Sequence, residues 1–333
     1  MKKIMRLLLG SGLAATLLTG CNNGGFIYHG KVYTEKDMSH FYTEKIAIDD
    51  LQTIDVESNY ADLEIIASDD YYIEYSYYYI NKEPTLTIED KKLTFSDQDI
   101  NIGSYSINTK ETNYLKIYIP TTSDFDMINI EKSSGDCSIG SVKTNQLNLT
   151  NQYGETIIFG SEIGQLDLKE SSGKVVIDNT IINTAKIENT YGEVVLEGIN
   201  SQDAPCEQLE VTLSSGSISM NQVFSQKATI ENTYGEVEVD DSGFYEVDAN
   251  MSSGNLTIDY SYIDALSVKN TYGSVELALL GNEEDYQFDI RSSYGEVEIG
   301  TNTYEHSVFI DRGGMKKIIV STSSGNVEIK FIK

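Results

Sequence analysis

Residue types that often carry catalysis are scarce in this sequence, and they form no recognisable constellation. The three histidines are His29, His40 and His306, and none stands beside a nucleophile motif. Beyond residue 20 the arginines are Arg291 and Arg312. No catalytic residue is therefore predicted, and the chain is not expected to be an enzyme. A carbohydrate-active enzyme that uses two of the 52 acidic residues remains as a remote alternative.

The N-terminal cysteine, Cys21, is the first candidate for covalent modification. Residues 1–20 read as a signal peptide, with basic Lys2, Lys3 and Arg6, an apolar run over 7–18, and small residues before Cys21. The order Leu-Thr-Gly-Cys resembles the bacterial lipoprotein box, in which the cysteine is diacylated. Two acyl chains anchor a protein stably, so the resemblance implies a membrane-anchored, extracytoplasmic protein.

The other cysteines, Cys137 and Cys206, are expected to be free thiols. Cys137 stands where sister repeats carry valine or isoleucine, so it should point into the core. Cys206 falls in an insertion three repeats later. If repeats stack like strands, the two lie roughly 14 Å apart, too far for a disulfide.

Acidic residues give the chain a net charge of −28, with 24 Lys+Arg against 52 Asp+Glu. Nucleic acid is thus excluded as a partner, because phosphate binding needs a basic surface. Glu155, Glu193, Glu236 and Glu296 recur at one repeat position, which makes calcium an alternative ligand there. No calcium-loop motif is present, so neither a metal nor another cofactor is predicted.

A tyrosine-rich run, residues 71–80, is the candidate for ligand contact. Its alternation places Ile73, Tyr75, Tyr77 and Tyr79 on one strand face. Tyr75, Tyr77 and Tyr79 could stack on sugar rings, although such aromatics more often cover a sheet edge or core.

Two short phrases, Tyr-Gly and Ser-Ser-Gly, recur along the chain and must position all of these residues. Their glycines follow a period of about 19 residues with a few longer gaps: Gly135, Gly154, Gly173, Gly192, Gly216, Gly235, Gly254, Gly273, Gly295 and Gly325. Each is flanked by runs in which apolar residues alternate with polar ones. A fixed period of this length indicates a solenoid, and the glycine would allow positive φ at a corner. The sequence therefore predicts an all-β solenoid with alternating Ser-Ser-Gly and Tyr-Gly corners.

The length of one coil is open between two values, about 19 and about 38 residues, which place one repeat or two in each coil. With the shorter coil, each tyrosine lies over a serine and the next tyrosine is about 9.6 Å away. With the longer coil, the tyrosines and the asparagines Asn151, Asn189, Asn232 and Asn270 would form direct ladders at about 4.8 Å. We favour the shorter coil, because the longer one needs a wider core than this sequence can fill.

The chain divides into a signal peptide at 1–20, a tether at 21–45, a degenerate N-terminal β region at 46–126 and the regular array at 127–333. Asn59-Tyr60-Ala61-Asp62 reads as a degenerate corner, so the solenoid is expected to begin near residue 50. Longer gaps at 197–207, 281–286 and 304–317 predict loops that project from one face. The run 327–333 is expected to be an edge strand that its lysines protect.

The run 115–120 (LKIYIP), the run 128–139 (INIEKSSGDCSI) and the repeated L-x-L-x-x-S-S-G-x-V-x-I together resemble the bacterial "putative adhesin" β-strand-repeat domain of unknown function. The resemblance covers about residues 46–333, and it implies a secreted or membrane-tethered protein. No catalytic residue carries over from that family.

Taken together, these patterns predict a lipid-anchored, extracytoplasmic binding or scaffold module of the adhesin type. Its partners would be the membrane and an envelope protein or cell-surface glycan. The alternative is an accessory or sensor lipoprotein of the cell envelope that binds a membrane protein.

Overall fold

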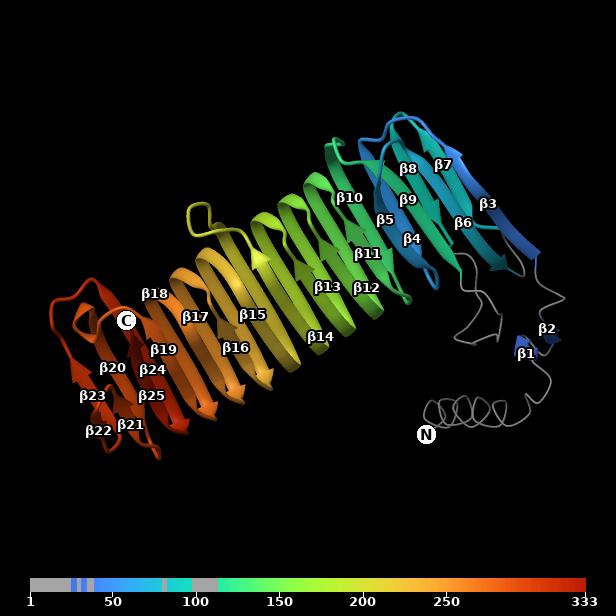
Figure 1. The fold of residues 1–333 in the computed structure, drawn as a ribbon. Helices are drawn as coiled ribbons and strands as arrows, with labels where there is room; N and C mark the ends of the chain where they lie inside the picture. Colours follow the sequence, from blue (N-terminus) through green and yellow to red (C-terminus); the bar gives the residue numbers. More distant parts are fainter. Residues whose placement is uncertain (1–24, 29–30, 35–38, 80–82, 98–112) are drawn as a thin grey trace.

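The structure is a computed structural model that describes residues 25–28, 31–34, 39–79, 83–97 and 113–333. It is an elongated stack of β-coils (Figure 1). The N-terminal strands are β1 (Gly25–Tyr28), β2 (Lys31–Thr34), β3 (Ser39–Ala47), β4 (Thr53–Ser58), β5 (Asp62–Ser68), β6 (Tyr72–Tyr79), β7 (Thr85–Glu89), β8 (Lys92–Ser96) and β9 (Tyr114–Pro120). The central strands are β10 (Phe125–Lys132), β11 (Cys137–Gly140), β12 (Lys143–Phe159), β13 (Glu162–Asp178), β14 (Ile181–Ile199), β15 (Cys206–Tyr234), β16 (Val237–Asp240), β17 (Gly243–Ser253), β18 (Leu256–Tyr272) and β19 (Val275–Leu280). The C-terminal elements are the short 3₁₀ helix η2 (Glu283–Asp285), β20 (Tyr286–Ser292), β21 (Val297–Ile299), β22 (Asn302–Tyr304), β23 (Ser307–Ile310), β24 (Lys316–Ser324) and β25 (Val327–Ile332).

Strand register confirms the solenoid and settles the coil length in favour of the shorter alternative, with one repeat in each coil. Parallel pairing places Gly154 beside Gly173 and Gly173 beside Gly192. Tyr153 and Tyr191 both pair with Ser172, one from each side. The direct tyrosine ladder of the longer coil is therefore excluded.

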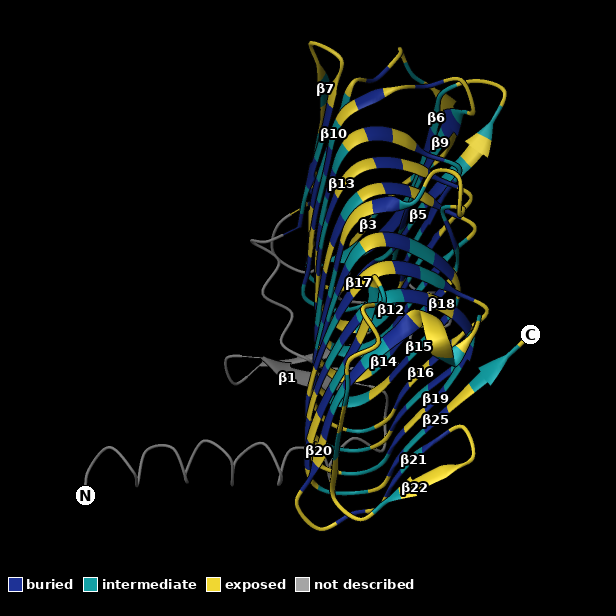
Figure 2. Cartoon of the chain, turned by 90° about the vertical axis from the view of Figure 1, so that its left-hand side faces the viewer, coloured by how far each residue is buried: buried dark blue, intermediate teal, exposed yellow. Residues whose placement is uncertain are grey.

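The core is a continuous apolar column between the two sides of each coil. In β13, Leu166 and Leu168 are buried before the corner, and Val175 and Ile177 are buried after it. The residues that alternate with them, such as Asp167 and Val176, are only partly buried, and buried and more exposed bands alternate along the coils (Figure 2). This is the pattern expected when each coil stacks its apolar side chains on those of the next coil.

Chain order and spatial order differ at both ends of the stack. Strand β24 lies between β18 and β20, and β25 lies between β19 and β21. The last coil of the chain is thus inserted between two earlier coils (Figure 1). The expectation that residues 327–333 form an edge is wrong for residues 327–329, which pair with both β19 and β21. Residues 330–332 pair with β19 alone, so Lys330 lies in a stretch that has one strand neighbour.

At the N-terminal end, β4 lies between β8 and β10, and β5 lies between β9 and β11. Ala61 takes the corner position beside Gly135, as the degenerate repeat predicts. Residues 53–68 therefore stack directly on the regular array. Beyond them, β3 pairs antiparallel with β6, and β6 pairs antiparallel with β9.

The segment predicted as a tether, residues 21–45, contains strands in its described part. Strands β1 and β2 pair antiparallel, and β3 begins at Ser39. In β3, His40 stacks on Tyr78 with ring centroids 4.2 Å apart and forms a hydrogen bond with Ser76 Oγ at 2.8 Å. Strand β3 thus belongs to the N-terminal end of the stack.

Candidate binding surfaces

The repeat glycines form one corner of the solenoid, and their backbone explains why glycine is needed. Gly192 has φ +142°, and a Cβ added there would lie 1.9 Å from the carbonyl oxygen of Gly173. Positive φ is confirmed at every repeat glycine except Gly295. At Gly295 glycine is needed for space alone, since a Cβ would lie 1.9 Å from the Gly325 carbonyl oxygen. Stacked glycines therefore let successive coils approach closely at this corner.

Buried asparagines hold this corner from the inside. Asn151, Asn189, Asn232 and Asn270 donate from Nδ2 to the glycine carbonyl of the preceding coil, at 2.8–3.3 Å. All four side chains are at most 3% exposed. The corner is thus fixed by side-chain hydrogen bonds as well as by strand pairing.

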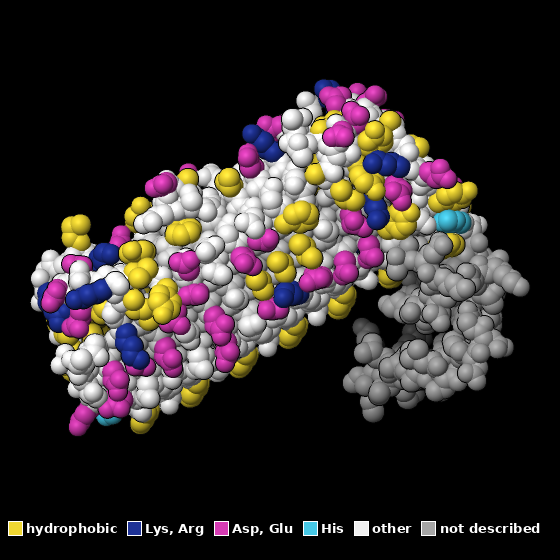
Figure 3. Space-filling view, viewed as in Figure 1, with side chains coloured by type: hydrophobic (Ala, Val, Ile, Leu, Met, Phe, Trp, Pro, Cys, Tyr) yellow, Lys and Arg dark blue, Asp and Glu magenta, His cyan; other side chains and the backbone are white. Residues whose placement is uncertain are grey.

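A row of exposed tyrosines and half-buried serines runs along this corner, directly before the glycines. We call it the tyrosine edge. In spatial order its members are Tyr60, Ser134, Tyr153, Ser172, Tyr191, Ser215, Tyr234, Ser253, Tyr272, Ser324 and Tyr294. Tyr153, Tyr191, Tyr234 and Tyr272 are 60–62% exposed, so each has nearly the same surroundings. Evenly spaced hydrophobic side chains mark one edge of the rod in Figure 3.

Alternation along the tyrosine edge depends on the exchanged coil order. In the sequence, Tyr272 and Tyr294 belong to successive repeats, and Ser324 comes last. In space, the coil of Ser324 lies between the other two. Tyrosine and serine therefore alternate along the whole edge, although they do not alternate along the whole sequence.

Polar residues flank the tyrosine edge on both sides. Before each tyrosine or serine stands an uncharged polar residue, for example Gln152, Ser171, Thr190, Ser214 and Thr233, all of them exposed. The position after each glycine is often acidic.

The carboxylates of the acidic row are spread along the stack and take part in contacts with neighbouring coils. Glu155 and Glu193 lie two coils apart, about 9.6 Å along the stack. Lys174 stands on the coil between them and pairs with Glu193 at 2.9 Å. Asp136 Oδ1 accepts a hydrogen bond from the Glu155 backbone N–H at 2.9 Å. Within the described ranges, no three His, Cys, Asp or Glu residues are placed to hold a metal ion. Glu236 and Glu296 belong to the same row.

The insertion between β14 and β15, residues 200–205, separates two hollows. One hollow has a volume of about 370 Å³ and is bordered by Lys143, Glu162, Asn183 and Pro205. The other has a volume of about 190 Å³. Pro205 borders both hollows, so this loop is the wall between them. The expectation that the insertion projects agrees with its visible excursion from the coils (Figure 1).

The smaller hollow, which we call the aromatic hollow, is lined by Phe224, Tyr245 and Tyr262. The phenyl ring of Phe224 lies over Gly243, where a Cβ would meet Phe224 Cδ1 at 2.8 Å. Lys316 borders the hollow and pairs with Asp264 at 3.1 Å. An aromatic floor with a few fixed polar groups is typical of a small binding site.

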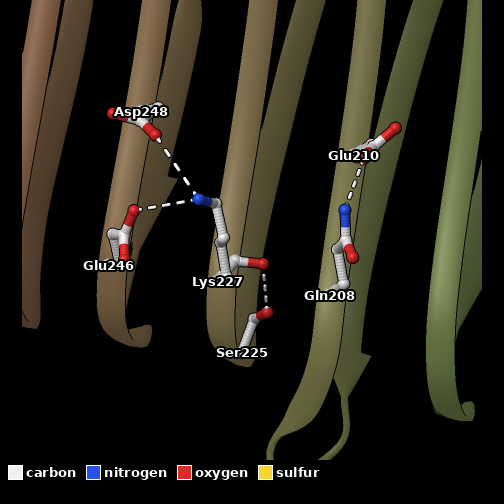
Figure 4. Close-up of polar contacts among 6 residues, drawn as sticks. All are labelled: Gln208, Glu210, Ser225, Lys227, Glu246 and Asp248. Atoms are coloured by element: carbon white, nitrogen blue, oxygen red, sulfur yellow. Dashed lines mark hydrogen bonds and ion pairs between the residues drawn. The ribbon is translucent and has the colours of Figure 1, made fainter.

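On the sheet next to the aromatic hollow, charged and polar side chains pair with one another. Lys227 Nζ lies 3.0 Å from Glu246 and 3.9 Å from Asp248, and Gln208 donates to Glu210 at 2.5 Å (Figure 4). These groups are therefore engaged with one another rather than presented to a ligand.

A buried column of polar side chains lies behind the glycine corner in the N-terminal half. Lys132, Asn151, Glu170 and Asn189 occupy one register position in four successive coils. Lys132 Nζ donates to the carbonyl of Ala61, and burial lowers the pKa of its ammonium. Glu170 Oε2 accepts a hydrogen bond from Thr156 at 2.9 Å.

Burial raises the pKa of Glu170 to about 8, against the opposing effect of the Thr156 hydroxyl. Glu170 Oε1 and the Oδ1 atoms of Asn151 and Asn189 have no hydrogen-bond partner. A buried carboxylate with an unpaired oxygen carries a desolvation cost that the neutral acid avoids. The neutral acid therefore fits this site at neutral pH better than the carboxylate does.

The three tyrosines predicted to contact a ligand are not equivalent. Tyr77 is 1% exposed and packs against Phe95 at a centroid distance of 5.0 Å, so it belongs to the core and cannot offer a sugar platform. Tyr75 is half-buried and stacks on Phe41, and Tyr79 is half-buried at the end of β6. The predicted open platform is therefore corrected at Tyr77.

The predicted thiols are confirmed as free. Both Cys137 and Cys206 are buried. Cys206 is corrected in one respect, since it begins β15 and points into the core instead of lying in the loop. Cys21, the predicted lipidation site, lies outside the described residues.

Sequence reasoning missed the aromatic hollow and Glu170. A signal for Glu170 exists, because it occupies an inward position where Asn151 and Asn189 stand in the neighbouring repeats. The hollow had no comparable signal. Its residues come from separate coils and from the insertion.

Comparison with solved structures finds similar chains of low identity. A "putative lipid binding protein" from Parabacteroides distasonis is 13% identical, with 89% of this chain and 97% of that chain covered and a TM-score of 0.37. A "putative adhesin" from Parabacteroides merdae is 12% identical, with the same coverages and a TM-score of 0.36. A "putative adhesin" from Bacteroides fragilis is 13% identical, covers 89% and 98%, and has a TM-score of 0.28.

A search of curated proteins gave no match. No helix in the described part of the chain is long and apolar enough to cross a membrane. One family model matches residues 51–205 and again residues 199–330, which together include nearly all of the coil stack. The chain therefore belongs to the Toastrack DUF4097 family, whose function is unknown.

Proposed function

We propose that this protein is a non-catalytic binding or scaffold module of the adhesin type, anchored by lipid at Cys21 on the extracytoplasmic face of the cell membrane. The tyrosine edge carries the proposal. It presents the same aromatic contact repeatedly along one side of a rigid stack. A surface of this kind suits repeated weak contacts with an extended partner.

Anchoring is supported by the sequence of residues 1–21, and it is tested separately from binding. We expect the full chain to fractionate with membranes in its bacterial host and to carry acyl groups on Cys21 by mass spectrometry. Cys21→Ala should release the protein into the soluble fraction. Equal membrane association of both proteins would contradict the anchor.

Binding is tested with labelled protein and isolated cell envelopes. The variant is Tyr191→Ser/Tyr234→Ser, which places at two tyrosine corners the residue that the intervening coils already carry. Its fold should therefore persist. We expect it to lose most envelope binding, whereas Tyr245→Ser in the aromatic hollow keeps it. Unchanged binding by the double variant would overturn the tyrosine edge as the contact surface.

A second candidate is an accessory or sensor lipoprotein that binds an envelope protein. The aromatic hollow favours it, because exposed Tyr245 and Tyr262 beside a projecting loop form an apolar contact. If this candidate is correct, the two variants exchange their effects on envelope binding. Tyr245→Ser/Tyr262→Ser would abolish envelope binding, and the tyrosine-edge variant would retain it.

A further inference from the structure

We propose that the ligand of the tyrosine edge is an extended, uncharged polysaccharide that lies along the solenoid axis. Successive tyrosine rings would stack on every second sugar. This inference rests on the proposed function and gives its contact surface a ligand class.

The first argument is spacing. Adjacent coils are about 4.8 Å apart, so successive tyrosines of the edge recur about every 9.6 Å. In a β-1,4-linked polysaccharide, successive sugars are flipped, and every second ring presents the same face. The two-sugar repeat of such a chain is of the same order as two coil spacings. From Tyr60 to Tyr294 the edge extends over about 48 Å, enough for several repeats.

The second argument is that the alternation belongs to the folded surface. If repeat duplication alone had produced it, the inserted last coil would place its corner residue without regard to its neighbours. Instead, the corner serine of that coil, Ser324, separates Tyr272 from Tyr294. Along the chain, two tyrosine repeats follow one another at this end. In space, the tyrosine edge still has one aromatic ring in every two coils.

The third argument is the chemistry on either side of the rings. Exposed hydroxyl and amide groups, such as those of Gln152, Thr190 and Thr233, can donate to and accept from sugar hydroxyls. Serine at the intervening corners leaves room between the rings. A tyrosine face with a polar margin suits a sugar, which has an apolar face and a hydroxylated rim.

Charge decides between classes of polymer and against self-association. The row after the glycines includes Asp136, Glu155, Glu236 and Glu296, and the whole chain has a net charge of −28. An anionic polysaccharide would be repelled. Two copies that joined edge to edge would bring these carboxylates against one another. An uncharged glycan avoids both penalties.

The experiment is isothermal titration of the protein with chito-oligosaccharides and cello-oligosaccharides of increasing length, from a disaccharide to a decasaccharide. The affinity should rise with length, because each added two-sugar unit reaches another tyrosine. Tyr191→Ser/Tyr234→Ser should weaken decasaccharide binding by about tenfold or more and should affect the disaccharide much less. Tyr245→Ser is the control outside the edge and should bind as the wild type does.

Several results would overturn the inference. The first is an affinity that does not change with length, and the second is equal binding of an anionic polymer such as polygalacturonate. The third is a dimer that the double variant abolishes, seen by sedimentation, which would make a second copy the occupant. If no oligosaccharide binds while the double variant still loses envelope binding, the ligand class is wrong and the proposed function stands. If the double variant keeps envelope binding, the proposed function itself fails.

Discussion

Replacing Glu170 by glutamine should stabilise the protein at neutral pH. Burial raises the pKa of this carboxyl to about 8 from its ordinary value of 4.5. The folded state therefore holds a proton that the unfolded state releases between these two values. The contribution of this carboxyl to the free energy of unfolding is complete below pH 4.5 and is lost as the pH rises towards 8. Glutamine keeps the shape of the neutral acid and has no proton to lose.

The size of the effect follows from linkage. One unit of pKa difference corresponds to about 1.4 kcal/mol. At pH 7 the unfolded carboxyl is ionised and the folded one is mostly protonated, which costs the wild type up to about 3 kcal/mol. At pH 5 the cost is below about 1 kcal/mol.

The assay is equilibrium urea unfolding followed by circular dichroism, at pH 5 and pH 7, for the wild type and Glu170→Gln. Glu231→Gln removes an exposed carboxylate and serves as the matched control. We expect the gain in unfolding free energy from Glu170→Gln to be larger at pH 7 than at pH 5. A Glu170→Gln variant that is less stable at pH 7, or a gain that does not depend on pH, would refute the reasoning.

Three further predictions concern the corner, the core and the inserted coil. Gly192→Ala adds a steric clash with the preceding coil to the strain of positive φ, so calorimetry should show a larger fall in melting temperature than for Gly281→Ala. Gly281 has φ +133° but open space around it, and its strain alone costs roughly 1–3 kcal/mol. Burial raises the pKa of Cys137 to about 12 and that of Cys206 to about 11, so neither thiol should react with a disulfide reagent at pH 8 until the protein unfolds. Deletion of 327–332 should expose β19 and β21 together in hydrogen exchange, whereas loss of a simple edge strand would expose β19 alone.

Most of the regular array could be predicted from the sequence, because its signals are local. A glycine that recurs at a fixed period, with alternating apolar neighbours, specifies a corner, two strands and an inward face without any distant contact. For the same reason the degenerate corner at Ala61 and the inward position of Cys137 could be found. Each depends only on its place within one repeat.

The parts that were not predicted depend on which coil lies beside which. Nothing in the sequence of β25 shows that it is inserted between β19 and β21, so the sequence predicted an edge strand. Tyr77 alternates as a platform residue would, but the pairing of β6 with β3 and β9 turns its face into the core. The aromatic hollow likewise joins Phe224 and Lys316, which only the folded stack brings together.

The claim that the tyrosine edge is the contact surface can be tested most directly by tyrosine acetylation, read by mass spectrometry, with and without cell-envelope polysaccharide. The account predicts that the polysaccharide protects Tyr191 and Tyr234, while Tyr245 and Tyr260, which are exposed but lie away from the tyrosine edge, react as before. Protection of Tyr245 with full reaction at Tyr191 and Tyr234 would contradict it and would place the contact at the aromatic hollow.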